Sequence, residues 1–499
     1  MAGNERSVRD SFRSRWGFIL ACIGSAVGMW NIWRFPVLVS AYGGLTFLIP
    51  YVLFVVLIGS TGVIEEFALG RWAGAGPVDA FGKCVEARGG KRKTGMAIGF
   101  LPVVGSLMLA IGYTVVQGWI FKYCFMGISG GLFALGTDMG EIVGEFSRTA
   151  PETETLGAAV RTMFQGGVFG VGNTMWQLIG LGVSLVIMAL GVSGGIERAN
   201  KVMMPLLFGL FLALGIYIAT LKGAGDGYRY ILTLNPKGLL NPEVWIYAFG
   251  QAFFSLSVAG NGSVIYGSYL SKKENVISSA RNVAVFDTIA ALLAAFVIIP
   301  ATAVGSAELE KGGPGLMFIY LVRVLNNMAG GRIVGMIFFI CVLFAALSSI
   351  INLYEAPIAY MQERFGLKRL PAVLVIGLIG TAVSVLIQPW TSQWMDVVSI
   401  YICPAGALLA AIMFFWVLKK QTALDAVNER RKERRQMVLS DGQICLLSLC
   451  AGGAGRGRAA GRNRLIENRH AALNRGMPVF DIWGNQPIRS SRFTFSEPR

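Results

Sequence analysis

The sequence has few of the residues that enzymes use for acid–base or metal chemistry. Its 499 residues include a single histidine, His470, and only 14% of them are charged. The cysteines and the histidine do not form the two ligand pairs of a zinc site, and Cys22, Cys124, Cys341 and Cys403 fall in apolar segments, where buried thiols are inert. The sequence also lacks a phosphate-binding glycine loop and a nucleophile–base arrangement. We therefore expect neither an enzyme nor an organic cofactor.

Apolar residues are abundant: they make up 54% of the chain and gather in long runs. Runs of about 20 apolar residues match the hydrocarbon core of a bilayer, which is about 30 Å thick. The sequence therefore predicts an all-α, polytopic membrane protein. The ten transmembrane helices that we predict are residues 16–38, 43–68, 96–125, 173–191, 200–221, 242–269, 282–304, 332–361, 371–388 and 394–418.

Basic residues occur mainly in alternate loops. They precede the first span, follow the second at residues 71–93 and follow the sixth at residues 272–281, whereas the loop at residues 127–172 is mostly acidic. Cytoplasmic loops carry an excess of lysine and arginine. This pattern predicts a multi-pass protein of the cell membrane with both termini in the cytoplasm.

The C-terminal region differs from the rest of the chain. From Lys419 onward it holds 16 Lys and Arg against 7 Asp and Glu. Nucleic-acid binding is one interpretation, but an ordinary basic cytoplasmic end is favoured next to a membrane, so we expect no nucleic-acid partner. Its composition cannot bury a core. We predict a cytoplasmic segment at residues 1–15, a transmembrane domain at 16–420 and a disordered tail at 421–499, and leave the oligomeric state open.

Two of the predicted spans contain small and polar residues near their middle. The first holds GSAVG at residues 24–28, and the sixth holds SLSVAGNGS at residues 255–263. Unpaired backbone groups in hydrocarbon cost several kcal/mol each, so such a segment is tolerated only where it lines a cavity or binds a ligand. Two unrelated kinked helices are the alternative.

These two spans are the first of two groups of five, at residues 16–221 and 242–418. An odd number of spans in the first group inverts the second group in the membrane. The pattern predicts a 5+5 inverted repeat with broken helices 1 and 6, and a binding site between them near the bilayer midplane.

The string NIWRFP at residues 31–36, preceded by GSAVGM, resembles the sodium:neurotransmitter symporter family. GQAFFSLS (250–257), GSYL (267–270) and FAALSS (344–349) fit the same family, in the expected spans and order. The similarity extends to the bacterial leucine transporter, the type member of the family. The resemblance implies that one or two sodium ions drive the symport of a neutral amino acid into the cell by alternating access.

The resemblance implies two sodium sites. One takes the backbone carbonyls of Gly24, Val27 and Ala345 with the hydroxyls of Ser348 and Ser349. Taken alone, the two serines would be interpreted as hydroxyls that bond to their own helix.

The other sodium site takes the Ala26 carbonyl, the Asn31 amide, Ser255 and Asp287, where the family commonly has asparagine. A carboxylate in mid-membrane costs about 2.5–3.5 kcal/mol on the gentlest scale, so it should face a cation. One turn further on, Ala291 stands where the type member has a glutamate. Because Asp287 can supply the negative charge that a bound chloride gives other members, we predict chloride-independent transport.

The ends of broken helices suit a free amino acid, since exposed amides attract its carboxylate and exposed carbonyls attract its ammonium group. Tyr113 matches the family tyrosine that holds the carboxylate, although it could be a packing aromatic. The substrate-binding residues that the resemblance implies are Met29, Trp30, Leu109, Tyr113, Phe254, Ser255, Ser257, Gly260, Ser349 and Leu353.

Two positions around this pocket depart from the family pattern. Trp30 replaces a glycine, and Gly260 stands where the type member has phenylalanine, so pocket volume is kept while its shape changes. Asn352 adds polarity nearby. We expect a neutral amino acid that is small or polar. Arg34 and Asp396 match the external gate pair of the family. An ion pair of this kind is strong when water is excluded and weak when it is exposed to solvent, as a gate that reopens requires.

Two alternatives remain. A proton-coupled symporter would use Asp287 or Glu355 as proton carrier, and a sensor would bind the amino acid on the same fold without translocating it. Glu65, Glu66 and Glu355, which lie in or near spans, are interpreted as structural partners rather than proton carriers.

Overall fold

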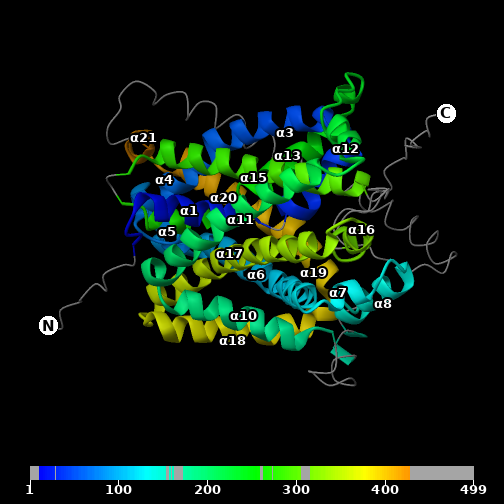
Figure 1. Cartoon of the computed structure of the whole chain (residues 1–499). Helices are drawn as coiled ribbons and strands as arrows, with labels where there is room; N and C mark the ends of the chain where they lie inside the picture. Colours follow the sequence, from blue (N-terminus) through cyan, green and yellow to red (C-terminus); the bar gives the residue numbers. More distant parts are fainter. Residues whose placement is uncertain are drawn as a thin grey trace.

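The computed structural model describes residues 11–28, 30–152, 157–158, 160–161, 172–258, 262–271, 274–304 and 315–427, and in this part of the chain the regular structure is entirely helical. The long helices run side by side as one bundle (Figure 1). This confirms the predicted all-α class. Met29 and Gly260, both predicted to bind substrate, lie outside the described residues, as does most of the predicted tail.

The helices, in chain order, are α1 (Arg15–Ala26), η1 (Trp30–Arg34), α2 (Phe35–Ala41), α3 (Leu45–Ile58), η2 (Gly59–Val63), α4 (Ile64–Ala73), α5 (Pro77–Ala87), α6 (Arg92–Ser129), α7 (Gly131–Ala134), α8 (Met139–Thr149), α10 (Thr174–Ala189), η3 (Val192–Ile196), α11 (Glu197–Ala219), α12 (Ala224–Ile231), η4 (Gly238–Leu240), α13 (Pro242–Ser255), α14 (Gly262–Ser268), α15 (Val276–Val304), η6 (Leu316–Tyr320), α16 (Leu321–Asn327), α17 (Gly331–Phe365), α18 (Arg369–Ile387), η7 (Gln388–Trp390), α19 (Thr391–Val397), η8 (Val398–Ile402), α20 (Cys403–Ile412), η9 (Met413–Val417) and α21 (Lys420–Val427).

Six helical stretches in the described part of the chain are long and apolar enough to cross a bilayer, and the bent pair Arg15–Ala26 and Trp30–Ala41 makes a seventh. The six are Leu45–Ala73, Arg92–Ser129, Val192–Ala219, Val276–Val304, Gly331–Phe365 and Arg369–Val417. The other predicted spans correspond to the 16-residue α10, to the interrupted pair α13 and α14, and to α20, which shares the last stretch with α18. The helices are therefore consistent with the predicted ten spans.

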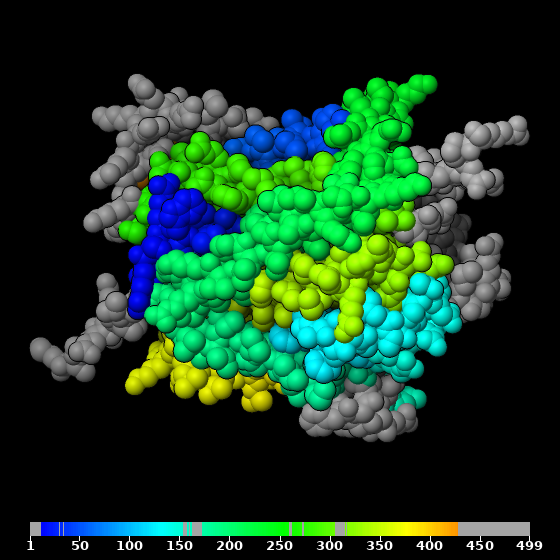
Figure 2. Space-filling model, viewed as in Figure 1, coloured from blue at the N-terminus to red at the C-terminus, as the bar shows by residue number. Residues whose placement is uncertain are grey.

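Large apolar side chains point outward from several helices. On α3, Ile49, Leu53 and Val56 are exposed, and on α18 Leu374 and Leu378 are 58% and 71% exposed. Residues three or four apart lie on one face of a helix. Apolar faces of this extent are unfavourable in water and favourable in hydrocarbon. On the face in Figure 2, α11 (green) and α17 (yellow-green) cover the centre of the bundle.

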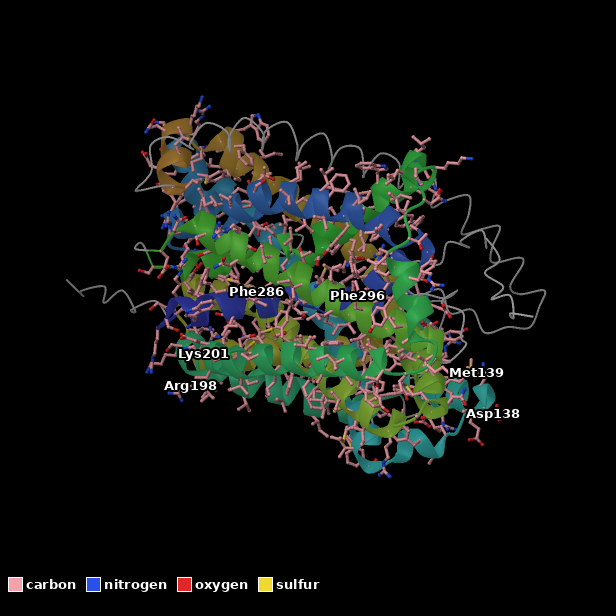
Figure 3. All side chains as sticks on the ribbon, turned by 45° about the horizontal axis from the view of Figure 1, so that its top comes forward. Asp138, Met139, Arg198, Lys201, Phe286 and Phe296 are labelled. Atoms are coloured by element: carbon pink, nitrogen blue, oxygen red, sulfur yellow. The ribbon has the colours of Figure 1, made fainter. Side chains whose placement is uncertain are left out.

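The two ends of the bundle differ in form. Arg198 and Lys201 lie at one end, and Asp138 and Met139 lie near the opposite end (Figure 3). The short helices α7, α8, α12 and α16 gather at the end that holds Asp138 (Figure 1). The sequence predicts that the end with Arg198 and Lys201 is cytoplasmic.

The first span breaks after Ala26. The Gly28 amide donates to the Ala26 carbonyl at 2.8 Å, and the Asn31 amide donates to the Gly28 carbonyl at 3.1 Å. In a continuing α-helix these two amides would pair with the carbonyls of Gly24 and Val27. The axis bends by 63° between Arg15–Ala26 and Trp30–Ala41. Helix 1 is therefore broken, as predicted.

The sixth span breaks after Ser255, the last residue of α13. Two residues later Ser257 has a φ of +57°, the only left-handed backbone among the described non-glycine residues. Such a conformation costs on the order of 1–3 kcal/mol and persists where the surroundings hold it in place. The next helix, α14, begins at Gly262, so helix 6 is also broken.

Candidate functional site

The two helix breaks lie against each other. The Ser257 hydroxyl donates to the Ser25 carbonyl at 2.7 Å, and this bond joins the break of the sixth span to that of the first. It also helps to hold Ser257 in its left-handed conformation. Because the breaks adjoin, their irregular backbone faces protein and not lipid, which is the condition for such backbone at membrane depth.

Asn31, Ser255 and Asp287 form a buried polar cluster at these breaks. Asn31 Nδ2 donates to Asp287 Oδ1 at 2.6 Å, and Ser255 Oγ lies 2.6 Å from Asp287 Oδ2 and 2.8 Å from Asn31 Oδ1. All three residues are at most 1% exposed. The residues come from η1, α13 and α15, so the cluster links three predicted spans.

This cluster has the chemistry of a sodium site. A carboxylate, an amide oxygen and a hydroxyl are hard oxygen donors, and they carry one negative charge between them. The Ala26 carbonyl, also predicted as a ligand, accepts from the Gly28 amide and keeps a second lone pair. Tyr51 Oη lies 3.5 Å from Ser255 Oγ on the other side of the cluster.

A second group of oxygens lies where α1 packs against α17. An ideal Cβ built on Gly24 would lie 3.1 Å from Ser348 Cβ, and one on Gly28 would lie 2.9 Å from Ser349 Oγ. Ser348 Oγ donates to the Ala345 carbonyl at 3.0 Å. Ser349 Oγ is buried and has no hydrogen-bond partner among the described residues. Gly24 and Gly28 of the first break therefore lie beside Ser348 and Ser349, while the Val27 carbonyl stays a predicted ligand.

A small cavity of about 40 Å³ lies between the breaks. A single water molecule needs about 10–15 Å³, so the cavity has room for a few waters. Its lining residues are Ser25, Ala26, Gly28, Trp30, Leu109, Tyr113, Phe254, Ser257, Ser349, Asn352 and Leu353.

Most of the predicted substrate-binding residues line this cavity, but Ser255 does not. Its hydroxyl faces Asn31 and Asp287 instead. Ser25 lines the cavity although we did not predict it, and its place inside the GSAVG string is the signal that could have identified it. Asn352 follows Ser349 by three residues and so shares its helix face.

An aromatic and cationic stack covers one side of the cavity. The Trp30 ring packs on Phe254 with centroids 5.0 Å apart and planes 19° apart. On the other face of this stack, the Arg34 guanidinium carbon lies 4.5 Å from the Trp30 ring centroid. Arg34 and Asp396 are both half-buried. Arg34, one residue of the predicted gate pair, therefore packs on a tryptophan that the family pattern does not contain.

Glu355 has the structural role that the sequence favoured. Its Oε1 accepts from Tyr269 Oη and Arg369 Nη1, both at 2.7 Å, and its Oε2 accepts from Arg369 Nη2 at 2.6 Å. The pair is almost fully buried. Glu65 and Glu66 are also buried, but their carboxyl oxygens have no hydrogen-bond partner among the described residues.

The model of the sodium:neurotransmitter symporter family matches residues 9–134 and 140–434. This chain belongs to that family. Members of the sodium:neurotransmitter symporter family are sodium-dependent transporters and not enzymes. Together with the long apolar helices, this membership makes the chain a multi-pass membrane protein of a sodium-dependent class.

Individual relatives agree with this assignment. An uncharacterised sodium-dependent transporter of Bacillus subtilis is 33% identical over 346 residues, which cover 69% of this chain and 71% of the relative. One of Methanocaldococcus jannaschii is 28% identical over 439 residues, covering 84% of each chain. The solved structure of MhsT in complex with L-phenylalanine is 31% identical, with a TM-score of 0.75, and the match covers 89% of this chain and 99% of MhsT.

Proposed function

We propose that this chain is a symporter that uses the sodium gradient to carry a neutral amino acid into the cell by alternating access. The observation that supports this most directly is the bond between Ser257 and Ser25, which joins the two helix breaks beside the cavity. The two oxygen clusters described above would hold the sodium ions. The L-phenylalanine bound to MhsT supports an amino acid as the solute.

Sodium binding and solute binding would be coupled because the sodium clusters and the solute cavity share or adjoin the same residues. Ser349 lines the cavity and also belongs to the cluster between α1 and α17. Asn31 lies in η1, directly after Trp30 of the cavity wall. Sodium bound at either cluster would fix backbone that also contacts the solute, so each ligand would raise the affinity for the other.

The cavity favours a small solute without a charged side chain. None of the described residues that line it is ionised. The amino group of the solute would face the C-terminal end of α13, and its carboxylate would face the start of η1 and Tyr113. The Trp30–Phe254 stack leaves little room beyond these groups, so a large side chain would have to separate the two rings.

Asp287 supports chloride-independent transport. Its carboxylate contacts Asn31 and Ser255, so its ionised form would place a negative charge in the first sodium cluster. A transporter with this charge needs no bound anion to balance its cations. Chloride that stimulates wild-type uptake tenfold would contradict this proposal. We also propose that both termini are cytoplasmic.

A panel of radiolabelled neutral amino acids, offered to proteoliposomes that contain the full chain, tests the proposed function. Accumulation should require an inward sodium gradient and should be abolished when gramicidin collapses it. Accumulation driven by a proton gradient without sodium would indicate the proton-coupled alternative. Sodium-dependent binding without accumulation would indicate a sensor. Of the two carboxyls considered as proton carriers, Glu355 is less suited, because Arg369 neutralises it.

A further inference from the structure

We propose that Asn200 supplies an additional oxygen ligand to the sodium site between α1 and α17. This inference rests on the proposed sodium coupling. The asparagine lies on α11, one turn from the start of the helix, and belongs to no motif through which the sequence resembles the family. It would make α11 a third helix, beside α1 and α17, that holds the same ion.

The orientation of the Asn200 amide is fixed by a hydrogen bond. Nδ2 donates to the Ile196 carbonyl at 2.9 Å. The opposite orientation would set two oxygens against each other, because a carbonyl and an amide oxygen are both acceptors. Oδ1 therefore points away from Ile196, and it has no hydrogen-bond partner among the described residues. Asn200 is 1% exposed, so bulk water does not reach it.

The unpaired oxygen lies beside Gly24, a residue of the predicted sodium site. An ideal Cβ built on Gly24 would overlap Asn200 Oδ1 and would lie 3.1 Å from Ser348 Cβ. The amide oxygen and Ser348 therefore both adjoin Gly24, whose carbonyl is a predicted ligand. Only glycine leaves room for this approach.

A ligand at this oxygen would remove an energetic penalty, and the position beside Gly24 distinguishes Asn200 from other buried amides. A buried acceptor without a partner costs about 1–3 kcal/mol, whereas an apolar side chain of similar size would cost nothing of this kind. Ser349 Oγ is unpaired in the same region. A hard cation that both oxygens contact would remove both penalties, and a neutral amide adds an oxygen to the site without adding charge.

Glu197, one turn before Asn200, connects the same two helices. Its Oε2 accepts from the Arg13 amide at 2.7 Å, and its Oε1 accepts from the Ser14 hydroxyl at 2.8 Å. These hydrogen bonds link the start of α1 to α11. A sodium ion bound by Asn200 would add a second link between the two helices, near Gly24. Loss of that ion would leave Glu197 as the remaining polar link between α1 and α11 among these contacts. Release of sodium would therefore help α1 to separate from α11.

Sodium binding to the purified full-length protein tests this inference, with sodium alone as the probe. Binding to the folded state raises the unfolding midpoint as the ion concentration rises. The midpoint temperature of thermal unfolding is measured by tryptophan fluorescence. Choline chloride replaces sodium chloride at each lower sodium concentration, so the ionic strength stays constant. For Asn200→Ala we expect the half-saturating sodium concentration to rise about tenfold. Asn200→Asp retains an oxygen and should need no more sodium than the wild type.

The aspartate variant separates a ligand from a structural residue. If the bond from Nδ2 to Ile196 were all that mattered, both variants would lose stability and neither would change the sodium requirement. Asn173→Ala is the matched control, because its amide also donates to a backbone carbonyl, that of Val115, and its oxygen is also buried and unpaired. It contacts α6 and the Gln388 side chain, away from α1.

Three results would overturn the inference. An Asn200→Ala variant with a sodium requirement within twofold of the wild type would show that the oxygen does not bind the ion. An equal shift in Asn173→Ala would show a general effect of losing a buried amide. A wild type that sodium does not stabilise would refute the sodium coupling of the proposed function together with this inference, whereas the first two results leave that function intact.

Discussion

Replacing Asp287 with asparagine should weaken sodium binding and create a requirement for chloride. The substitution keeps one side-chain oxygen near Asn31 and Ser255, which lie 2.6 Å from the present carboxylate, and removes its charge. A unit charge about 4 Å from a cation contributes about 4 kcal/mol at an effective dielectric constant of about 20. This is an upper limit, because neighbouring groups relax.

A loss of about 1.4–2.8 kcal/mol corresponds to a 10- to 100-fold higher half-saturating sodium concentration. Chloride could then occupy the region near Ser255 and Tyr51, whose hydroxyls lie 3.5 Å apart, and restore the missing charge. The assay is a sodium titration of uptake in proteoliposomes, once in chloride and once in gluconate. The wild type should give the same curve in both, and Asp287→Asn should recover in chloride. A variant within twofold of the wild type in both media would refute the role of this charge.

Three further predictions concern the helix breaks and the cavity. Asn31→Ala and Ser349→Ala should each abolish sodium-driven uptake, and wild-type sodium dependence in both would show that the ion sites are misplaced. Gly24→Ala should abolish uptake because its Cβ would overlap Asn200, whereas Gly209→Ala on α11, whose Cβ meets nothing within 4 Å, should transport normally. Trp30→Gly removes a ring stack and a cation–π contact worth about 1–2.5 kcal/mol together, and large neutral amino acids should then compete at least tenfold better for uptake. Trp30→Phe should keep the wild-type order of competitors, and an unchanged order in Trp30→Gly would contradict the size limit.

The sequence predicts the broken helices for a physical reason. Glycine and polar residues in GSAVG and SLSVAGNGS weaken a helix in hydrocarbon unless it lines a cavity or binds a ligand, so composition indicates where the two helices are interrupted. The span count follows less directly. The 16-residue α10 falls below the length of an ordinary span, and α18 and α20 belong to one helical stretch.

The contacts of the candidate site depend on tertiary packing between residues far apart in the chain, which local sequence patterns do not predict. The resemblance indicates Ser348 and Ser349, but the approach of Asn200 to Gly24 joins residues 176 positions apart. The Ser257–Ser25 bond is of the same kind, since it spans 232 positions. The role of Glu355 depends on Arg369, which lies across a helix–helix turn and which no residue pattern pairs with it.

The central claim is that sodium and the amino acid bind together where the two broken helices meet. Parallel measurement of ²²Na⁺ influx and radiolabelled amino-acid influx into the same proteoliposomes tests it most directly. We predict that each flux rises when the other solute is added outside, and that Asn31→Ala and Ser349→Ala eliminate both stimulations. Amino-acid influx that proceeds with no accompanying ²²Na⁺ influx would contradict the claim.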